Sequence, residues 1–97
     1  MLLFAKEIEC VQAEGDYVSL RVGEKTYLVR ETMAAMEERL GLGFLRIHRS
    51  VIVNAARIRE LRPQPNGEFV VVMHSGFEVR ASRGYAERLR GVIGNPL

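Results

Sequence analysis

Apolar and polar residues alternate along most of this chain, and a period of two is typical of β-strands with one buried face. The clearest segment is residues 17–22, in which three apolar side chains are predicted to face inward and the other three outward. The inward set is Val18, Leu20 and Val22, and the outward set is Tyr17, Ser19 and Arg21. Further strands are expected over residues 8–13, 25–30, 44–47, 58–62, 68–73 and 77–80. Turn signals separate them, such as Asn66-Gly67, which favours a tight hairpin. The pattern predicts a mostly β fold of short, mainly antiparallel strands.

One segment after the third strand has helical spacing. Met33, Met36 and Leu40 recur at intervals of three and four residues, directly after Thr32, a good N-cap residue. Gly41 then ends the segment, as glycine commonly does at a helix C-terminus. We expect a short amphipathic helix whose methionines pack into the core.

A second short helix is expected near the end of the chain. Ser82 is a candidate N-cap, with Tyr85 and Leu89 on the buried face. The tail over residues 91–97 is expected to fray. No repeat or linker interrupts the pattern, so we expect one domain with a core of about residues 7–90.

Residues 45–54 contain a position that a straight strand cannot accommodate. Read as one strand, this segment places on a single face Leu45, Ile47, Val51 and Val53, together with Arg49. Because burying an unpaired guanidinium is very costly, the strand is expected to break around residues 48–50. The break would expose an imidazole, a guanidinium and a hydroxyl on a rigid β-framework.

The charge is distributed unevenly along the sequence. Residues 1–41 carry five Lys/Arg against eight Asp/Glu, whereas residues 42–97 carry nine against four. The formal net charge of the whole chain is +2. A basic half favours an anionic partner such as nucleic acid, although a solvated basic surface explains it equally simply.

Composition and motifs exclude several classes of protein. A chain of 97 residues with 47% hydrophobic and 27% charged residues is typical of one soluble domain. It has no apolar run of the roughly 20 residues that a membrane helix needs. The single Cys10 cannot form an internal disulfide, which favours a reducing cytoplasm. No nucleotide-binding, hydrolase or metalloprotease motif is present, so we expect no enzymatic activity, no catalytic residue, no cofactor and no metal site.

Two Ser/Arg pairs are candidate anion sites. Arg49 and Ser50 would lie in a loop at a strand end, and Ser82 and Arg83 at the start of the last helix. A helix start offers free N–H groups and the positive end of the helix dipole, both of which suit phosphate. Each pair alone is weak evidence, because exposed arginines beside serines are common.

Five segments in this order resemble the LytTR DNA-binding domain, over roughly residues 7–89. They are Glu-Gly-Asp-Tyr-Val at 14–18, Tyr-Leu-Val-Arg-Glu-Thr-Met at 27–33, Phe-Leu-Arg-Ile-His-Arg-Ser-Val-Ile-Val-Asn at 44–54, Ile-Arg-Glu-Leu at 58–61 and Ser-Arg-Gly-Tyr at 82–85. The third segment and the later Ser-Arg are the most specific. The resemblance implies an elongated, predominantly β fold with one or two short helices. It also implies that loops, and not a recognition helix, read successive major grooves of double-stranded DNA.

The resemblance assigns base contacts to three loops. The matching positions here are Asp16 and Tyr17 in the first, Arg49 in the second and Arg83 in the third. Arginine can donate two hydrogen bonds to guanine O6 and N7, but it can equally hold a phosphate. In the first loop, Asp16 would have to accept from a cytosine amino group, and Tyr17 could donate to a phosphate. The candidate phosphate contacts are Ser50, Arg46, Arg57, Arg59, Arg62 and Ser82.

The resemblance also implies partners. The family usually carries this domain behind a receiver or sensor domain, for which this chain has no room. The family commonly binds paired direct repeats, with the pairing directed by the partner domain, so the isolated domain is expected to be a monomer. No membrane partner is expected. Three alternatives stay open: a protein-interaction module using exposed strand edges, a general nucleic-acid binder that includes RNA, and a small enzyme or sensor built on His48, His74 and Cys10.

Overall fold

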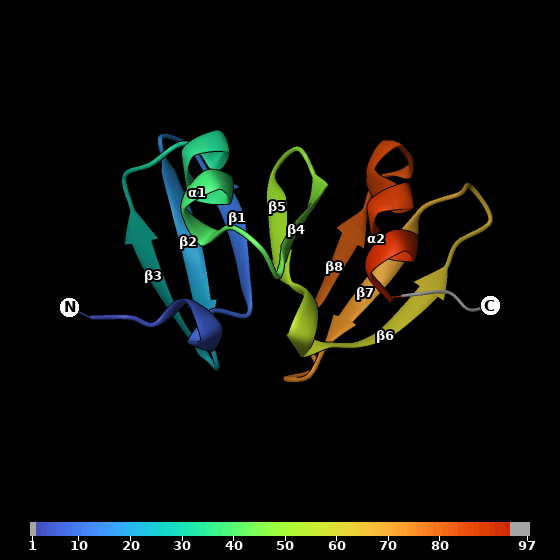
Figure 1. Ribbon diagram of the computed structural model, residues 1–97, viewed down its shortest axis with the longest axis horizontal. Coiled ribbons are helices and arrows are strands. Elements are labelled where there is room, and N and C mark those ends of the chain that lie inside the picture. Colours follow the sequence, from blue (N-terminus) through green and yellow to red (C-terminus); the bar gives the residue numbers. More distant parts are fainter. Residues whose placement is uncertain (1, 94–97) are drawn as a thin grey trace.

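The computed structural model describes residues 2–93, which form two antiparallel sheets side by side along the longest dimension of the molecule (Figure 1). The larger sheet contains, in spatial order, β3 (Lys25–Val29), β2 (Tyr17–Val22), β1 (Cys10–Glu14), β5 (Val51–Asn54) and β4 (Phe44–His48). The smaller sheet contains β6 (Ile58–Pro63), β7 (Phe69–Met73) and β8 (Glu78–Ala81). The extents of 40 × 22 × 21 Å confirm the elongated, mostly β fold.

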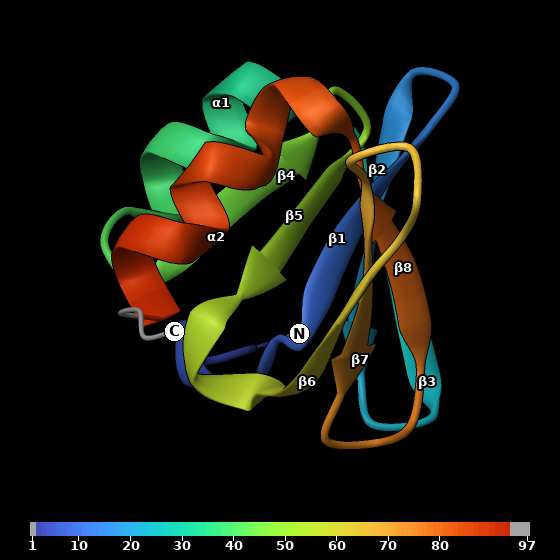
Figure 2. The same cartoon turned by 90° about the vertical axis from the view of Figure 1, so that its right-hand side faces the viewer.

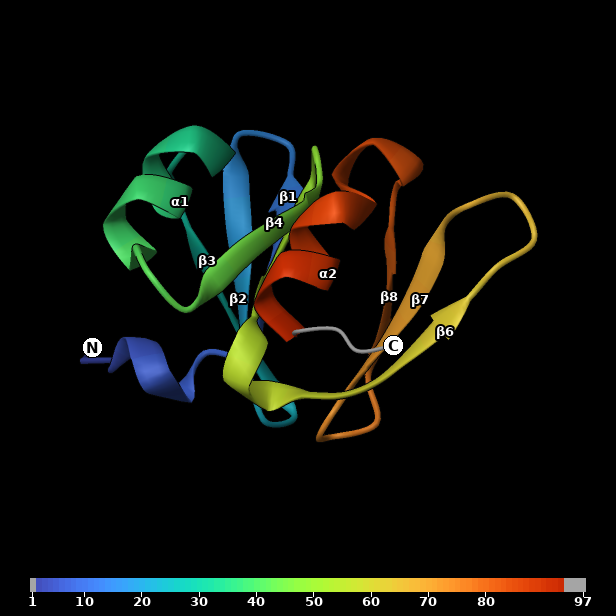
Figure 3. The same ribbon diagram turned by 45° about the vertical axis from the view of Figure 1, so that its right-hand side comes forward.

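Two α-helices and three one-turn 3-10 helices complete the described fold. The α-helices are α1 (Met33–Leu40) and α2 (Ala86–Ile93), and the short helices are η1 (Ala5–Glu7), η2 (Ala55–Arg57) and η3 (Arg83–Tyr85). Both α-helices lie on the same side of the molecule (Figure 2). Figure 3 shows β4 between them, and β4 contacts both.

The predicted alternation produces the hairpins β1–β2–β3. Two-residue turns containing Gly15 and Gly23 join the strands, and both glycines have the positive φ that such turns favour (62° and 63°). Val18 and Leu20 are buried as predicted. The alternation predicted that Arg21 faces outward, but its guanidinium carbon lies 3.9 Å from the centroid of the Phe77 ring, in the turn before β8. The prediction was wrong here because periodicity does not reveal that a second sheet covers this face.

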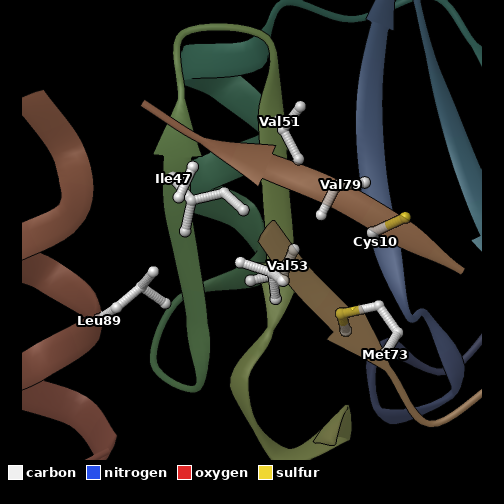
Figure 4. Close-up of a cluster of buried hydrophobic side chains, with 9 residues drawn as sticks. Cys10, Ile47, Val51, Val53, Met73, Val79 and Leu89 are labelled. Carbon is white, nitrogen blue, oxygen red and sulfur yellow. The ribbon is translucent and has the colours of Figure 1, made fainter. Parts of the chain in front are cut away.

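The strands β1 and β5 of the larger sheet are buried on both faces, so their neighbouring residues enter different cores. One core lies between the two sheets and contains Cys10, Ile47, Val51, Val53, Val71, Met73, Val79, Ala81 and Leu89 (Figure 4). The other lies under α1 and contains Ile8, Val11, Val18, Leu20, Met33, Met36 and Ile52. β5 contributes to both, and this is why its residues form a continuous apolar run.

The predicted first helix is confirmed by its caps. The Thr32 Oγ1 accepts a hydrogen bond of 3.0 Å from the Ala35 N–H. The Gly41 N–H closes the last turn on the Glu37 carbonyl, with φ of 67° at the glycine. Met33 and Met36 are buried against the larger sheet, as the spacing predicts.

The last helix begins without the predicted side-chain cap at Ser82. Ser82 occupies the N-cap position of η3, but its side chain makes no capping hydrogen bond. Its backbone N–H donates instead to the Ile47 carbonyl at 2.9 Å. Residues 91–93 continue α2, and the rest of the tail that was expected to fray, residues 94–97, lies outside the described residues. Elsewhere strand ends shift by one or two residues; the first strand begins at Cys10 and not at residue 8.

Candidate nucleic-acid interface

Three turns lie along one edge of the molecule, the upper edge in Figure 1. They are the β1–β2 turn (residues 15–16), the β4–β5 turn (residues 49–50) and residues 82–83, which lead into η3. We call these three turns the loop edge. Backbone hydrogen bonds of 2.9 Å tie the middle turn to its neighbours: the Ala13 N–H donates to the Ser50 carbonyl, and the Ser82 N–H donates to the Ile47 carbonyl. The two sheets therefore hold the three turns in a fixed order along the long axis.

The middle turn is shaped by a β-bulge and by His48. The register between β4 and β5 shifts between Arg46 and His48, which leaves Ile47 as the extra residue and a two-residue turn beyond. The His48 Nδ1 accepts a hydrogen bond of 3.1 Å from the Ser50 N–H and lies 2.9 Å from the Ser50 hydroxyl. Because Nδ1 accepts, the ring proton is assigned to Nε2. The expected break is confirmed, and the strand ends with its polar side chains outside the core.

Arg49 projects from this turn into solvent. Among residues 2–93 its side chain has no hydrogen bond or ion pair, although its carbonyl accepts a hydrogen bond of 2.6 Å from the Arg46 Nη2. The backbone is thus held while the guanidinium stays available. An available guanidinium on a fixed backbone can donate two parallel hydrogen bonds to an anion or a guanine edge.

Arg83, the first residue of η3, is the second available guanidinium of the loop edge. It is exposed and has no hydrogen bond or ion pair within the described part of the chain. The stem of its side chain lies on the β6–β7 turn, since a Cβ added to Gly67 would come within 2.8 Å of the Arg83 Cδ. Gly67 has φ of 87°, so glycine serves the turn and leaves room for this arginine.

The first turn has a different chemistry. Asp16 is exposed, and the neighbouring Tyr17 is 41% exposed with its ring centroid 5.8 Å from the Arg30 guanidinium carbon. These residues line a hollow of about 590 Å³ between the turn and the start of α1, where Thr32 also contributes. The tyrosine hydroxyl can donate to a phosphate, and the carboxylate can only accept.

The predicted phosphate contacts do not all reach the loop edge. Ser50 and Ser82 lie on it, whereas Arg57 belongs to η2 at the opposite edge, where its Nε donates to the Lys6 carbonyl at 2.9 Å (Figure 1). Arg59 and Arg62 lie on β6 in the smaller sheet. The Arg62 Nε bonds to Glu60 at 3.0 Å, and this contact, with Glu78 nearby, raises the pKa of Arg62.

Sequence reasoning missed a cluster of side chains behind the loop edge. Glu37 of α1 lies 3.4 Å from the Nη1 of Arg46 on β4 and 3.5 Å from the Nη1 of Arg88 on α2. We call these three residues the Glu37 cluster. They come from three separate elements, so no spacing in the sequence could have indicated their contact. The guanidinium of Arg46, a predicted phosphate contact, is bonded to Glu37 and to the Arg49 carbonyl.

Comparison with known proteins relates this arrangement to a family. The model of the LytTr DNA-binding domain (LytTR) family matches residues 1–94. This chain belongs to the LytTR family. A solved LytTR domain of a putative methyl-accepting/DNA response regulator from Bacillus cereus superposes with a TM-score of 0.89 at 25% identity, covering 98% of this chain and 88% of that one. The chain is therefore a DNA-binding domain of the kind found in transcriptional regulators.

The curated relatives of this LytTR domain are longer proteins. Sensory transduction protein LytT of Bacillus subtilis is 29% identical over 94 residues, which is 96% of this chain and 39% of LytT. Transcriptional regulatory protein BtsR of Escherichia coli is 33% identical over 95 residues, which is 96% of this chain and 38% of BtsR. The chain thus spans about two fifths of the relatives that it matches.

The residues of the enzyme alternative do not converge in this LytTR domain. His48 precedes the β4–β5 turn on the loop edge, whereas His74 lies in the β7–β8 turn at the opposite edge, and Cys10 is buried between the sheets (Figure 1). Among the described residues, no three His, Cys, Asp or Glu side chains gather as a metal site. Within residues 2–93, no helix has the length and apolar character needed to cross a membrane.

Proposed function

We propose that this LytTR domain binds double-stranded DNA sequence-specifically through the loop edge. The observation that supports it best is the pair of available guanidiniums, Arg49 and Arg83, on two neighbouring turns of that edge. Each can recognise a guanine through O6 and N7, a contact worth about 1–3 kcal/mol of discrimination. Tyr17 and Asp16 supply the first turn with a donor and an acceptor.

The dimensions of the domain suit contacts in successive major grooves. The long axis measures 40 Å, and the three turns follow one another along it (Figure 1). One turn of B-DNA is about 34–36 Å long. The long axis of the domain is therefore about as long as one helical turn, so a domain lying along the duplex can span successive major grooves.

Phosphate contacts are proposed for residues on or beside the loop edge. The Ser82 hydroxyl, which makes no capping hydrogen bond, can donate next to Arg83, and the Ser50 hydroxyl can do so next to Arg49 if it exchanges its contact with the His48 Nδ1. Arg59 adds positive charge on β6, whereas Arg62 would have to exchange Glu60 and Glu78 for phosphate. Arg57 would reach phosphate only if the duplex bends toward the opposite edge. These contacts would fix the register of the protein on the duplex and carry no sequence information themselves.

The role in a longer protein follows from the relatives. LytT is named a sensory transduction protein and BtsR a transcriptional regulatory protein, and this chain matches about two fifths of each. We propose that the domain is the output module of such a regulator, controlled by a receiver or sensor domain. Paired direct repeats would then be bound by two copies, while the isolated domain stays monomeric.

The test is a titration of fluorescent duplexes, preceded by selection of the best-bound sequences. Wild type should yield a consensus, and log affinity should fall linearly with log salt. Arg49→Ala and Arg83→Ala should each relax the preference at particular base pairs and cost about 1–3 kcal/mol there. Equal weakening on all duplexes would make both arginines phosphate clamps. No duplex binding at low salt would favour a protein-interaction module, for which the edge strand β3 exposes 60% of Leu28.

A further inference from the structure

We propose that the Glu37 cluster is a positioning device that sets the geometry of Arg49 and Arg83, and that Arg46 acts within it and not as a phosphate contact. This inference rests on the proposed sequence-specific function. The cluster contains one carboxylate and two guanidiniums, contributed by α1, β4 and α2. These are the helix that begins beside the first turn, the strand that leads into the second turn, and the helix that follows η3.

Arg46 connects the carboxylate directly to the turn that carries Arg49. Its Nη1 lies 3.4 Å from the Glu37 Oε1, and its Nη2 donates to the Arg49 carbonyl at 2.6 Å. Only 20% of the Arg46 side chain is exposed. A guanidinium that is largely buried and already bonded on two sides is poorly placed to hold a phosphate. Its geometry instead fixes the backbone from which Arg49 projects.

Arg88 connects the same carboxylate to the element that carries Arg83. Its Nη1 lies 3.5 Å from the Glu37 Oε2 and 3.4 Å from the Arg46 carbonyl, to which it donates. Its guanidinium carbon lies 4.8 Å from the ring centroid of Tyr85, the last residue of η3. Each oxygen of Glu37 therefore approaches a different arginine: Arg46 bonds to the Arg49 carbonyl, and Arg88 lies against Tyr85 of η3, the short helix that begins with Arg83.

The expected consequence is a loss of discrimination and not of attraction to DNA. Bidentate recognition of a guanine edge requires both N–H groups to be aligned, so a small displacement of the turns weakens it. Phosphate attraction depends on charge and tolerates such displacement. Removing the negative charge of Glu37 should slightly raise the affinity for any duplex while lowering the discrimination between duplexes. The two effects therefore have opposite signs.

Glu38 offers a matched control on the same helix. It is exposed, and within the described residues it has no hydrogen bond or ion pair. Glu37→Gln and Glu38→Gln make the same change in charge and size one residue apart. Arg46→Lys keeps the charge of Arg46, but a single ammonium cannot reproduce the planar fork that holds both partners.

The experiment compares these three variants with wild type on the selected consensus duplex and on a scrambled duplex, over a series of salt concentrations. Thermal unfolding of each variant checks that it is folded. Glu38→Gln should leave the ratio of the two affinities unchanged. Glu37→Gln and Arg46→Lys should lower the ratio of the consensus affinity to the scrambled affinity about five- to tenfold. This is the lower end of the loss expected for a bidentate contact. The salt slopes of both variants should be those of wild type. The relaxed base pairs should coincide with those relaxed by Arg49→Ala or Arg83→Ala.

Two results would overturn the proposal while the proposed function stands. One is a Glu37→Gln variant that matches Glu38→Gln on both duplexes. The other is an Arg46→Lys variant that changes the affinity for both duplexes equally and so keeps the wild-type ratio, as expected of a charge that contacts phosphate. If wild type itself shows no consensus, the proposed function fails, and this inference fails with it.

Discussion

Asn54 shows how a single buried amide can fix the junction between the two sheets. It is 6% exposed and ends β5, where the chain passes through η2 toward the smaller sheet. Its Nδ2 donates to the Ile8 carbonyl at 2.9 Å, and its Oδ1 accepts from the Ala56 N–H at 3.1 Å. Both polar atoms of the side chain are thus satisfied, as burial requires. Asn54, a residue of the family motif, acts here in the framework and not at the loop edge.

Cys10 is the residue for which burial leads to a prediction about reactivity. It is 0% exposed, and desolvation, followed by the charge of Glu9, raises the pKa of its thiol from 9.0 to about 12. Since the thiolate is the reactive form, the native protein at pH 8 should react with a disulfide reagent far more slowly than the denatured protein. Fast labelling of the native state would contradict this account.

The same pKa shift predicts a pH dependence of stability. Below pH 9 the thiol is protonated in both states, so it makes no difference there. As the pH rises from 9 toward 12, the unfolded chain loses the proton first, and the free energy of unfolding of wild type should fall. Cys10→Ala lacks this contribution, so its free energy of unfolding should fall less than that of wild type as the pH rises. Denaturant titrations at pH 8 and pH 10.5 measure it; parallel curves would show that Cys10 does not titrate in this way.

At the level of the structural elements, the turns of the smaller sheet matter because one of them supports Arg83, for which we propose a DNA contact. The β6–β7 turn contains Gly67, against which the Arg83 stem lies, and the β7–β8 turn contains Gly76, which has open space around it. Both glycines have positive φ, 87° and 95° respectively. Both turns therefore need a residue with positive φ, but only the β6–β7 turn contacts another side chain at its glycine.

This difference predicts separate effects of two alanine substitutions. Gly67→Ala and Gly76→Ala should each destabilise the fold by about 1–3 kcal/mol, because alanine is strained at these backbone angles. Only Gly67→Ala places a methyl group against Arg83, so only this variant should also lose DNA affinity. Binding is measured at a temperature where both variants are folded. Equal affinities of the two variants would show that the position of Arg83 does not depend on the β6–β7 turn.

At the scale of the whole molecule, a polar cluster joins the two sheets at the edge opposite the loop edge. Glu9, which precedes β1, is 4% exposed and accepts hydrogen bonds from the Ser75 hydroxyl at 2.6 Å and from the Ser75 N–H at 3.2 Å. Ser75 lies in the β7–β8 turn. Arg21 of β2 approaches the same carboxylate at 3.9 Å and covers the Phe77 ring. The relative position of the sheets, and hence the spacing of the three turns of the loop edge, depends partly on these contacts.

Ser75→Ala tests the contribution of this cluster to stability. The substitution removes a hydrogen bond to a buried carboxylate, which is worth about 1.5–3 kcal/mol. His74→Ala in the same turn changes an exposed side chain and should stay within about 0.5 kcal/mol of wild type. Denaturant unfolding of the three proteins gives both values. A Ser75→Ala variant as stable as His74→Ala would mean that the apolar core alone holds the sheets together.

The local structure of this protein follows from residues that are near one another in the sequence. Alternation set the hairpins of β2 and β3, helical spacing with Thr32 and Gly41 set α1, and the cost of burying Arg49 set the turn between β4 and β5. These features depend on neighbours along the chain, which a sequence displays directly. The motif around residues 44–54 also sufficed to identify the family, because it combines a buried strand pattern with a polar turn.

What each buried face packs against depends instead on contacts between residues that are far apart in the sequence. The pairing of β1 with β5 brings together strands that are distant in sequence, and it places the three turns on one edge. The inward position of Arg21, the Glu37 cluster and the support of Arg83 by Gly67 all depend on such distant contacts. Hydrophobic periodicity indicates that a face is buried, but it does not indicate which other strand or helix covers that face. The side chains that meet across elements are selected by the packing of the whole chain.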